Sequence, residues 1–497
     1  MKTLAAVSIL IFCSVALLAQ QHIRVNDGAT GVRQEAPTLA IDANGNMTSA
    51  WIDFRTGGAQ VFLARSTTGG RTWTPAVRVS GANAKPTGGW ELGPYVTQLP
   101  SGEMSVIWTD MRRPPDWAHI DVCAARSTDN GRTFGADPRL NNDVMAAQQQ
   151  PAMTSDARNI YVAWHGFPAS GQNPATPIWA VRSTDGGATF SQQVRVDTYA
   201  PAQTDTIASC NCCGLGMFTN GSGNIYLPFR IDSANLRDIF LSRSTDYGVT
   251  WQQAVPVSHG RWFLNVCPGS GPRGVARGDT VWVAYMDQRS GYQAVYLTRS
   301  VDGGRSFGQD VKLADSSNFP DVTVDSRGRV ITAWSTVPRL NIAHVYCAAS
   351  EDGGLTFNKP VRVNPNAAIV NGQVTLAAAP NGNVYCTWRE TPPGDEGDMM
   401  FSNATELLYP PAGVDERGPR SPLMLSIAPQ PLLAGQSATV YCDASVTSLR
   451  IVDLLGRTAL TLDGQRAEQS FALTAPGTYF MIAHNGAAHD VRSIVVR

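Results

Sequence analysis

The stretch RSTDGGATF, residues 182–190, recurs in near-copies along the chain. Six segments follow the pattern Ser-x-Asp-x-Gly-x-Thr/Ser-Trp/Phe, although the first has Thr68 in place of the aspartate. These segments are 66–73, 127–134, 183–190, 244–251, 300–307 and 350–357. They start at intervals of about 50 to 61 residues, a period typical of the blades of a β-propeller. The repeat therefore predicts a propeller.

Short apolar or alternating runs surround each copy and are separated by Asn-Gly-type turns. In the first unit these runs are PTLAI, MTSAWID, QVFLARS and PAVRVS, which read as four antiparallel strands. An aromatic residue marks the second strand of each unit. There are seven such residues, which predicts seven units. The seven markers are Trp51, Trp108, Trp164, Phe229, Tyr285, Trp334 and Trp388.

The seventh unit lacks the repeated phrase and supplies only three strands. The segment HIRVND, residues 22–27, resembles the fourth strands AVRVSG, QVRVDT and PVRVNP. We expect this N-terminal strand to complete the last blade, because closure of the ring removes exposed sheet edges. The prediction is an all-β chain whose residues 22–408 form a seven-bladed propeller, with six blades as the alternative.

The repeated phrase is the Asp-box, and the chain resembles the sialidase superfamily and its secreted relatives. This resemblance implies a propeller that acts on or binds extracellular glycans, although sialidases of the usual type have six blades. The box itself is predicted to be scaffold. Its aspartate can accept backbone N–H bonds in a tight turn, its glycine can adopt positive φ, and its aromatic ring can pack between sheets.

Function is expected on the opposite face, where second strands end and first strands begin. The candidate catalytic residues there are Asp53, Arg55, Asp110, Arg112, Arg230, Asp287 and Arg289. The candidate ligand-binding residues in the strand-start loops are Glu35, Trp90, Glu91 and Arg273. Arginines around a funnel suit recognition of a carboxylate, and the acidic residues could serve as acid or base. Alternatively, each Asp-x-Arg pair is an ion pair that fixes its own loop.

The resemblance can be followed residue by residue. Sialidases carry an Arg-Ile-Pro phrase at the start of the first blade, and alignment on Pro37 puts Glu35 in the place of its arginine. Arg55 matches a second family arginine, whereas the loop after it, TGGAQ, lacks the family's acid/base aspartate. We therefore expect glycan recognition without a complete sialidase site. An active exo-sialidase-type glycoside hydrolase and a protein-binding surface propeller are the alternatives.

Four cysteines form a second distinctive feature. Cys210, Cys212 and Cys213 in SCNCCGLG open the first strand of the fourth unit, and Cys267 opens that of the fifth. Because these inner strands are neighbours, the sulfurs are expected to meet. Two disulfides, a zinc or copper(I) site, and free or redox-active thiols are all possible. No cofactor is required. The remaining mature cysteines, expected as buried core thiols, are Cys123, Cys347, Cys386 and Cys442.

The start of the chain indicates export. Residues 1–19 have a positive start and a short apolar stretch, the pattern of a cleaved signal peptide. No later apolar stretch is long enough for a transmembrane segment, and a formal net charge of −1 offers no field for nucleic acid. The expected partner is an extracellular glycan or glycoprotein, and the expected location is secreted or on the cell surface.

The composition changes near residue 409. Residues 409–420 read as a linker, and residues 421–497 as a small immunoglobulin-like β-sandwich of short strands. Pro429, Pro431, VDLLGR (452–457), GTYF (477–480) and the final Arg497 resemble a type IX secretion system sorting domain, with Gln430 where the family usually has asparagine. The resemblance implies recognition by that machinery and translocation across the outer membrane.

Overall fold

The structure is a computed structural model of the chain, in which two compact units, Met1–Tyr409 and Pro410–Arg497, are described separately. The described residues are 23–28, 31–88, 93–113, 119–142, 147–167, 176–199, 208–337, 343–364, 369–370, 374–391, 396–409, 425–428, 432–442, 446–453, 457–463, 466, 468–484 and 489–497. The predicted signal peptide and most of the predicted linker lie outside these ranges. No helix among the described residues is long and apolar enough to cross a membrane.

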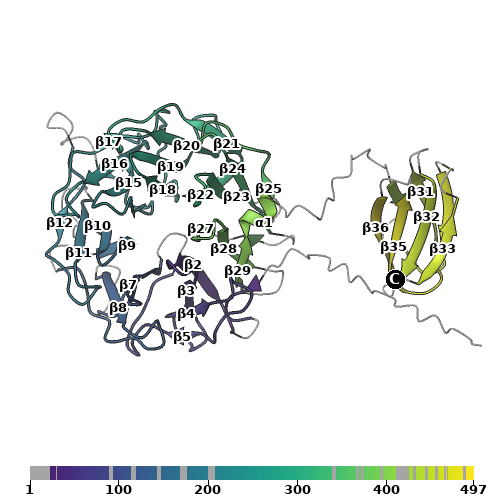
Figure 1. The fold of residues 1–497 in the computed structure, drawn as a ribbon, viewed down its shortest axis with the longest axis horizontal. Helices are drawn as coiled ribbons and strands as arrows, with labels where there is room; N and C mark the ends of the chain where they lie inside the picture. The colour runs from purple at the N-terminus through teal and green to yellow at the C-terminus, as the bar shows by residue number, and fades with distance from the viewer. Residues whose placement is uncertain are drawn as a thin grey trace, which may run out of the picture. The chain divides into compact units, whose positions relative to one another are not determined.

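The described residues of the first unit form seven antiparallel sheets, arranged as a ring in Figure 1. Sheet 1 contains β2 (Gln34–Ile41), β3 (Met47–Asp53), β4 (Gln60–Ser66) and β5 (Val77–Arg78). Sheet 2 contains β6 (Tyr95–Gln98), β7 (Met104–Asp110) and β8 (Asp121–Ser127). Sheet 3 contains β9 (Ala147–Ser155), β10 (Ile160–Phe167), β11 (Ile178–Ser183) and β12 (Val194–Arg195).

The remaining four sheets continue around the ring. Sheet 4 contains β13 (Ala208–Ser209), β14 (Phe218–Thr219), β15 (Ile225–Asp232), β16 (Ile239–Ser244) and β17 (Val255–Pro256). Sheet 5 contains β18 (Arg273–Arg277), β19 (Thr280–Asp287), β20 (Ala294–Ser300) and β21 (Val311–Asp315). Sheet 6 contains β22 (Ser317–Val324), β23 (Val330–Thr336), β24 (Val345–Ser350) and β25 (Val361–Arg362). Sheet 7 contains β26 (Ile369–Val370), β27 (Thr375–Ala378), β28 (Val384–Thr391), β29 (Asp398–Asn403) and β1 (Ile23–Arg24).

The N-terminal strand pairs with the last sheet, as the sequence predicted. In this antiparallel pair Ile23 lies opposite Phe401, and Arg24 lies opposite Met400. Sheet 7 has no Asp-box. A short helix, α1 (Ala404–Leu408), follows its third strand in the position that a box occupies in the other sheets. The chain therefore closes the ring by joining its first strand to its last sheet.

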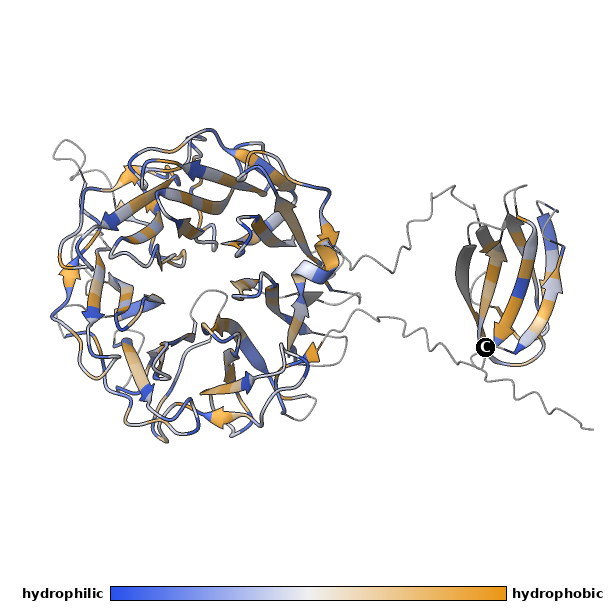
Figure 2. Cartoon of the chain, in the orientation of Figure 1, coloured by the Kyte–Doolittle hydropathy of each residue, from blue (hydrophilic) through white to orange (hydrophobic). Residues whose placement is uncertain are grey.

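Apolar clusters fill each junction between neighbouring sheets, so the core is distributed around the ring. Figure 2 shows apolar residues in every part of this unit. The junction of sheets 7 and 1 contains Val25, Trp51, Phe62 and Phe401. All seven aromatic markers of the second strands are buried. At about 25 cal/mol per Å2 of apolar surface, burial of this kind is the main source of stability.

The six boxes are tight turns in which side-chain oxygens accept backbone N–H groups of the same turn. In the third, Ser183 Oγ accepts from Gly187 N at 2.8 Å, and Asp185 accepts from Thr189 N at 2.9 Å and Thr189 Oγ1 at 2.6 Å. Gly187 has φ +82°, a conformation that favours glycine. In the first box Thr68 Oγ1 replaces the carboxylate as acceptor for Thr72 N. These contacts bear out the prediction that the box is scaffold.

A second repeated device ties the fourth strand of a sheet to its third strand. A Ser, Asn or Asp in the outer segment of the sheet accepts the N–H group of the first or second residue of the third strand, at 2.8 to 3.0 Å. The donor–acceptor pairs are Val61–Ser80, Val122–Asn141, Ile178–Asp197, Ile239–Ser258, Val345–Asn364 and Met399–Asn26. The segment after the N-terminal strand therefore makes the same contact as the outer segments of five other sheets.

The second unit contains two sheets that share one apolar core. Strands β30 (Leu425–Ala428), β31 (Ser437–Cys442) and β34 (Glu468–Ala472) form one sheet. Strands β32 (Ser448–Asp453), β33 (Thr458–Leu462), β35 (Gly477–His484) and β36 (His489–Val496) form the other. Val440 and Phe471 of the first sheet belong to the same buried cluster as Ile451 and Met481 of the second, so the sheets pack face to face.

We predict that Asn26→Ala destabilises the first unit by about 1–3 kcal/mol, because the N–H group of Met399 then lacks its buried acceptor. All twelve tryptophans precede residue 409, so the urea midpoint of tryptophan fluorescence reports on this unit alone. Gln253→Ala, at an exposed position beside another outer strand, is the control. Equal midpoints for both variants would contradict a closing role for Asn26.

Candidate functional site

The predicted Asp-x-Arg pairs are ion pairs at the ends of second strands. Asp53 is fully buried and accepts from Trp51 Nε1 at 2.9 Å and from Arg55 NH2 at 2.7 Å. Asp110 is likewise buried and accepts from Trp108 Nε1 and from Arg112 NH2, both at 2.8 Å. The sequence WxDxR thus fixes an indole and a guanidinium on one carboxylate.

Sheet 5 contains a tyrosine version of the same arrangement. Asp287, which is buried, accepts from Arg289 Nε at 2.6 Å, and Arg289 NH2 donates to Tyr285 Oη at 2.9 Å. The guanidinium also lies over the ring of Tyr296, 4.3 Å from its centroid. The ion-pair interpretation of the sequence therefore describes all three Asp-x-Arg pairs.

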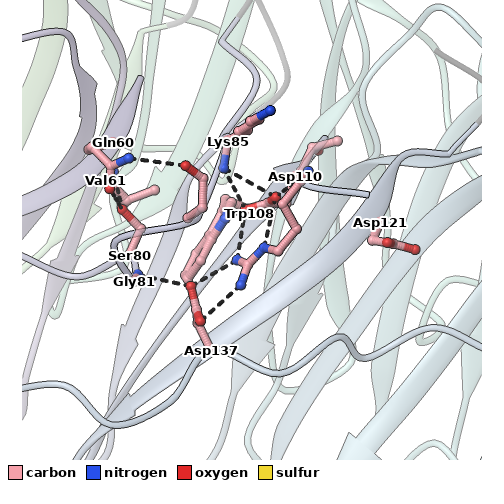
Figure 3. Close-up of polar contacts among 12 residues, drawn as sticks. Gln60, Val61, Ser80, Gly81, Lys85, Trp108, Asp110, Asp121 and Asp137 are labelled. Atoms are coloured by element: carbon pink, nitrogen blue, oxygen red, sulfur yellow. Dashed lines mark hydrogen bonds and ion pairs between the residues drawn. The ribbon is translucent and has the colours of Figure 1, made fainter. Parts of the chain in front are cut away.

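A second carboxylate turns each pair into a clamp between neighbouring sheets. Figure 3 shows the junction of sheets 1 and 2, where Asp137 accepts from Gly81 N at 2.9 Å and from Arg112 NH2 at 2.8 Å. At the junction of sheets 4 and 5, Asp310 accepts from Arg289 NH1 at 2.5 Å and from the N–H group of His259. Both guanidiniums therefore have their charge matched by two carboxylates.

In the clamp between sheets 7 and 1, the second carboxylate comes from sheet 7, whereas the arginine belongs to sheet 1. Asp27, at the end of the N-terminal strand, accepts from Arg55 NH1 and from Ala76 N, both at 2.7 Å. Hydrogen bonding to Asp53 raises the pKa of Arg55, and hydrogen bonding to Asp110 raises that of Arg112. Hence the arginines that the sequence assigned to substrate recognition are held by the scaffold.

Arg230 and Arg273 bind backbone carbonyls. Arg230 is 1% exposed and donates to Ser270 O, Arg237 O and Met286 O. Arg273, on β18, donates to Leu215 O at 2.9 Å and to Tyr95 Oη at 3.3 Å. Because Tyr95 belongs to β6, this contact joins sheets 5 and 2 across the centre of the ring.

Glu35 lies at the start of β2 in an incompletely satisfied polar cluster. Its Oε1 accepts from Arg33 Nε at 2.6 Å and lies 4.0 Å from Arg389 NH1 of β28. Its buried Oε2 has no hydrogen-bond partner within the described part of the chain, and neither has Arg389 Nε. The main chain at Gly88 packs against the Glu35 carboxylate. The neighbouring candidates Trp90 and Glu91 lie outside the described residues.

A recurring backbone distortion positions the starts of three inner strands. Ala36, Gln150 and Phe319 have φ values of +53°, +57° and +49°, and each precedes a proline. β-Bulges occur in the same places, between Glu35 and Thr38 for example. A non-glycine residue with positive φ costs on the order of 1–3 kcal/mol and often marks a functional site. The phrases QEAP, QQQP and SNFP were the overlooked sequence signal.

Two buried titratable groups lie near these strand starts. Burial raises the pKa of Asp321, on β22, to about 6, although its carboxylate accepts from Leu376 N at 2.7 Å. Burial lowers the pKa of His165 to about 4. The ring of His165 lies between Cys213 O and Ser209 Oγ, each 3.2 Å away. Both groups were missed in the sequence because apolar residues surround them in their strands.

The cysteine cluster contains one disulfide. The alternative with two disulfides is therefore not what the structure shows. Cys212 and Cys267 are bonded, whereas Cys210 and Cys213 are thiols whose sulfurs are 3.4 Å apart. The Sγ atoms of Cys210, Cys212 and Cys213 all lie within 4.8 Å of one another. The expectation that the four sulfurs meet is therefore met in the structure.

The other cysteines lie elsewhere in the fold. Cys123, Cys347 and Cys386 are buried thiols, as predicted, and the side chain of Cys442 lies outside the described residues.

A metal ion fits the cluster of Cys210 poorly. The disulfide leaves two thiols for coordination, and Arg237 NH1 donates to Cys210 Sγ at 3.4 Å, so a cation would meet a guanidinium.

A cavity of about 510 Å3 opens on the face of the ring that carries the Asp-boxes. Its walls include Ile41, Val275 and Val324, at the far ends of the inner strands from Glu35. The acids beside it, Asp42 and Asp325, accept backbone N–H groups within their own turns. This mouth of the ring is mainly scaffold, so the polar cluster at Glu35 is the stronger candidate site.

We predict that Asp110→Asn lowers the stability of the first unit by about 1–3 kcal/mol, because Arg112 then keeps only one of its two carboxylate partners and Trp108 loses its charged acceptor. Tryptophan fluorescence in urea measures the change, and Asp279→Asn at an exposed turn is the control. A stable Asp110→Asn variant would reopen a catalytic role for this carboxylate.

We also predict an acid-sensitive contribution from His165. Its folded-state pKa of about 4 lies below the ordinary value of 6.5, so the folded chain binds this proton less well than the unfolded chain. Stability should fall as pH drops from 6.5 towards 4, by about 3 kcal/mol. Wild type and His165→Gln are compared by urea unfolding across this range. A difference between them that does not change with pH would refute the assignment.

Comparison with known proteins gives the family. Residues 45–332 match the family model described as a BNR repeat-like domain. Three solved structures show a similar fold. One is a protein of unknown function from Dyadobacter fermentans DSM 18053, with 14% identity, 78% of this chain and 97% of that chain covered, and a TM-score of 0.46. The second is a Hadza microbial sialidase, with 14% identity, 74% and 75% coverage, and a TM-score of 0.45. The third is an ulvan lyase, a polysaccharide lyase, with 13% identity, 77% and 96% coverage, and a TM-score of 0.49. Because the match to the family model covers more than half of this chain, the chain belongs to the BNR repeat-like family.

Proposed function

We propose that the first unit is a seven-bladed propeller that binds an extracellular glycan at the strand starts around Glu35, without cleaving it. The observation that carries the proposal is the buried carboxylate oxygen of Glu35, which has no partner among the described residues, beside the equally unpartnered Nε of Arg389. Buried polar atoms without partners are costly, and a ligand that satisfies them gains that free energy on binding.

The two groups have complementary hydrogen-bonding capacity. The carboxylate of Glu35 accepts and the guanidinium of Arg389 donates, so adjacent sugar hydroxyls can bond to both at once. Burial lowers the pKa of Arg389, which reflects the incomplete pairing of its charge. A neutral sugar fits this pair better than a sialic acid, because a substrate carboxylate would lie against the carboxylate of Glu35.

The contacts of the other acids and arginines support recognition without hydrolysis. A sialidase-type reaction needs free guanidiniums for the substrate carboxylate and an accessible acid/base. Here Arg55, Arg112 and Arg289 are bound to carboxylates, and the buried partners Asp53 and Asp110 hold indole N–H groups. These contacts favour a binding propeller over an exo-sialidase-type glycoside hydrolase.

We further propose that the chain is exported by a signal peptide and sorted by its second unit through type IX secretion. Two of the sequence motifs that support this proposal include residues that the structure describes. In VDLLGR, Asp453 accepts from Arg457 Nε at 2.7 Å, and GTYF begins strand β35. The placement of this unit after a glycan-binding propeller suits a protein that is released or held outside the cell.

The test is a glycan array probed with the mature full chain, residues 20–497, and with Glu35→Gln and Arg389→Gln. We expect binding to neutral glycans without release of sugar, and at least tenfold weaker binding by either variant, the factor that loss of one charged hydrogen bond gives. Asp279→Asn, an exposed change on the other face, should bind as the wild type does.

Three outcomes contradict the proposal in different ways. Sugar release from sialylated glycans would establish the hydrolase alternative. Binding that survives both substitutions would place the site elsewhere on the propeller. Absence of glycan binding, together with capture of a surface glycoprotein after its glycans are removed, would establish the protein-binding alternative.

A further inference from the structure

The cysteine cluster joins two segments at the edge of the inner strands. Cys210 follows β13 directly, and its N–H group donates to Arg230 O at 2.8 Å. Its sulfur lies 3.4 Å from that of Cys213 and 3.5 Å from that of Cys212. Cys212 is bonded to Cys267, 55 residues later. The Cys210 sulfur therefore contacts both the thiol of Cys213 and the disulfide.

The charges around Cys210 favour its thiolate. Arg237 NH1 donates to its sulfur at 3.4 Å, and Arg230 adds a second positive charge, although Asp232 also pairs with Arg237 NH1. Hydrogen bonding from Cys213 is the largest of the effects that lower the pKa of Cys210, to about 6. By contrast, burial raises the pKa of Cys347 to about 12. A thiolate is the nucleophile of disulfide exchange.

Burial separates the four sulfurs into inner and outer pairs. Cys210 and Cys213 are each 1% exposed, whereas Cys267 is exposed and Cys212 is intermediate. A disulfide between Cys212 and Cys267 consequently lies nearer to solvent than one between Cys210 and Cys213 would. Movement of the disulfide inward would place two thiols where other molecules can reach them.

We propose that these four cysteines form a thiol–disulfide exchange centre with Cys210 as its nucleophile. In the first step the thiolate of Cys210 attacks Cys212 Sγ. A Cys210–Cys212 bond forms, the Cys212–Cys267 bond breaks, and Cys267 leaves as a thiolate. In the second step the Cys213 thiolate, having lost its proton to solvent, attacks Cys210, and Cys212 leaves as a thiolate that takes up a proton. The centre keeps one disulfide and two thiols throughout, so no external oxidant is required.

The exchange has a consequence for partners and for the fold. The released thiolate of Cys267 can attack a low-molecular-weight disulfide, forming a mixed disulfide and releasing one thiol. Breakage of the Cys212–Cys267 bond also removes the covalent link between the segment before β18 and the loop after β13. The substrate class is therefore a small exposed disulfide, and the activity is independent of glycan binding at Glu35.

The experiment uses the mature full chain, purified without reductant and treated under native conditions with oxidised glutathione. Peptide mass spectrometry then locates mixed disulfides and internal disulfides. In wild type we expect glutathione on Cys267 or Cys212 together with a Cys210–Cys213 bond. In Cys210→Ser the rate of modification should fall at least tenfold. Cys123→Ser, which removes a buried thiol outside the cluster, should leave the rate unchanged.

Cys213→Ser separates the two steps, because exchange then stops at the Cys210–Cys212 bond with Cys267 still modified. An unchanged rate of Cys267 modification in Cys210→Ser would overturn the proposal. So would a stoichiometric zinc or copper content with no disulfide in the wild type, or two permanent disulfides that leave no reactive thiol. If Cys210→Ser does not fold, wild type alone decides, because Cys267 modified without a Cys210–Cys213 or Cys210–Cys212 bond contradicts exchange.

Discussion

Ring closure depends on the contact between the N-terminal strand and Met399. Val25 N donates to Met399 O at 2.8 Å, and Asn26 Oδ1 accepts from Met399 N at 2.9 Å. Without this contact β29 would be an unprotected edge, and the apolar junction of sheets 7 and 1 would lose Val25. The closure joins residues 374 positions apart, since Arg24 also donates to Asp398. Every other sheet then needs only its neighbours along the chain.

The clamps at three sheet junctions explain why an arginine-rich face does not form a cationic funnel. Each guanidinium meets a buried aspartate two residues earlier and a second carboxylate that also accepts a backbone N–H group. Such pairs orient the loops where second strands end. Their charge is thereby used for orientation, whereas Glu35 Oε2 and Arg389 Nε are among the buried polar atoms that lack a partner in the described part of the chain. The site follows from what the scaffold leaves unsatisfied.

The sequence predicted the repeat, its strands and the closing N-terminal strand, because these depend on local turn chemistry and on strand pattern. It also brought Cys210 and Cys267 together, since they flank neighbouring inner strands. The sequence could not decide between a free and a paired Arg55, because its second partner, Asp27, follows the N-terminal strand, whose position depends on pairing with β29. It missed His165 and Asp321 for a related reason. Their altered pKa values arise from burial by several sheets, which strand pattern does not reveal.

Departures from the repeat coincide with the unusual chemistry. Sheet 1 alone has Glu35 at its bulged strand start, facing Arg389 of a sheet that has a helix in place of the box. Sheet 4 divides its inner edge into β13 and β14, and the cysteine loop occupies the interval. A segment that only completed a sheet would need neither a strained residue nor a thiolate. The box recurs six times, and its side-chain oxygens accept N–H groups within its own turn. The few positions outside the boxes, at the strand starts and in the cysteine loop, can therefore differ from sheet to sheet.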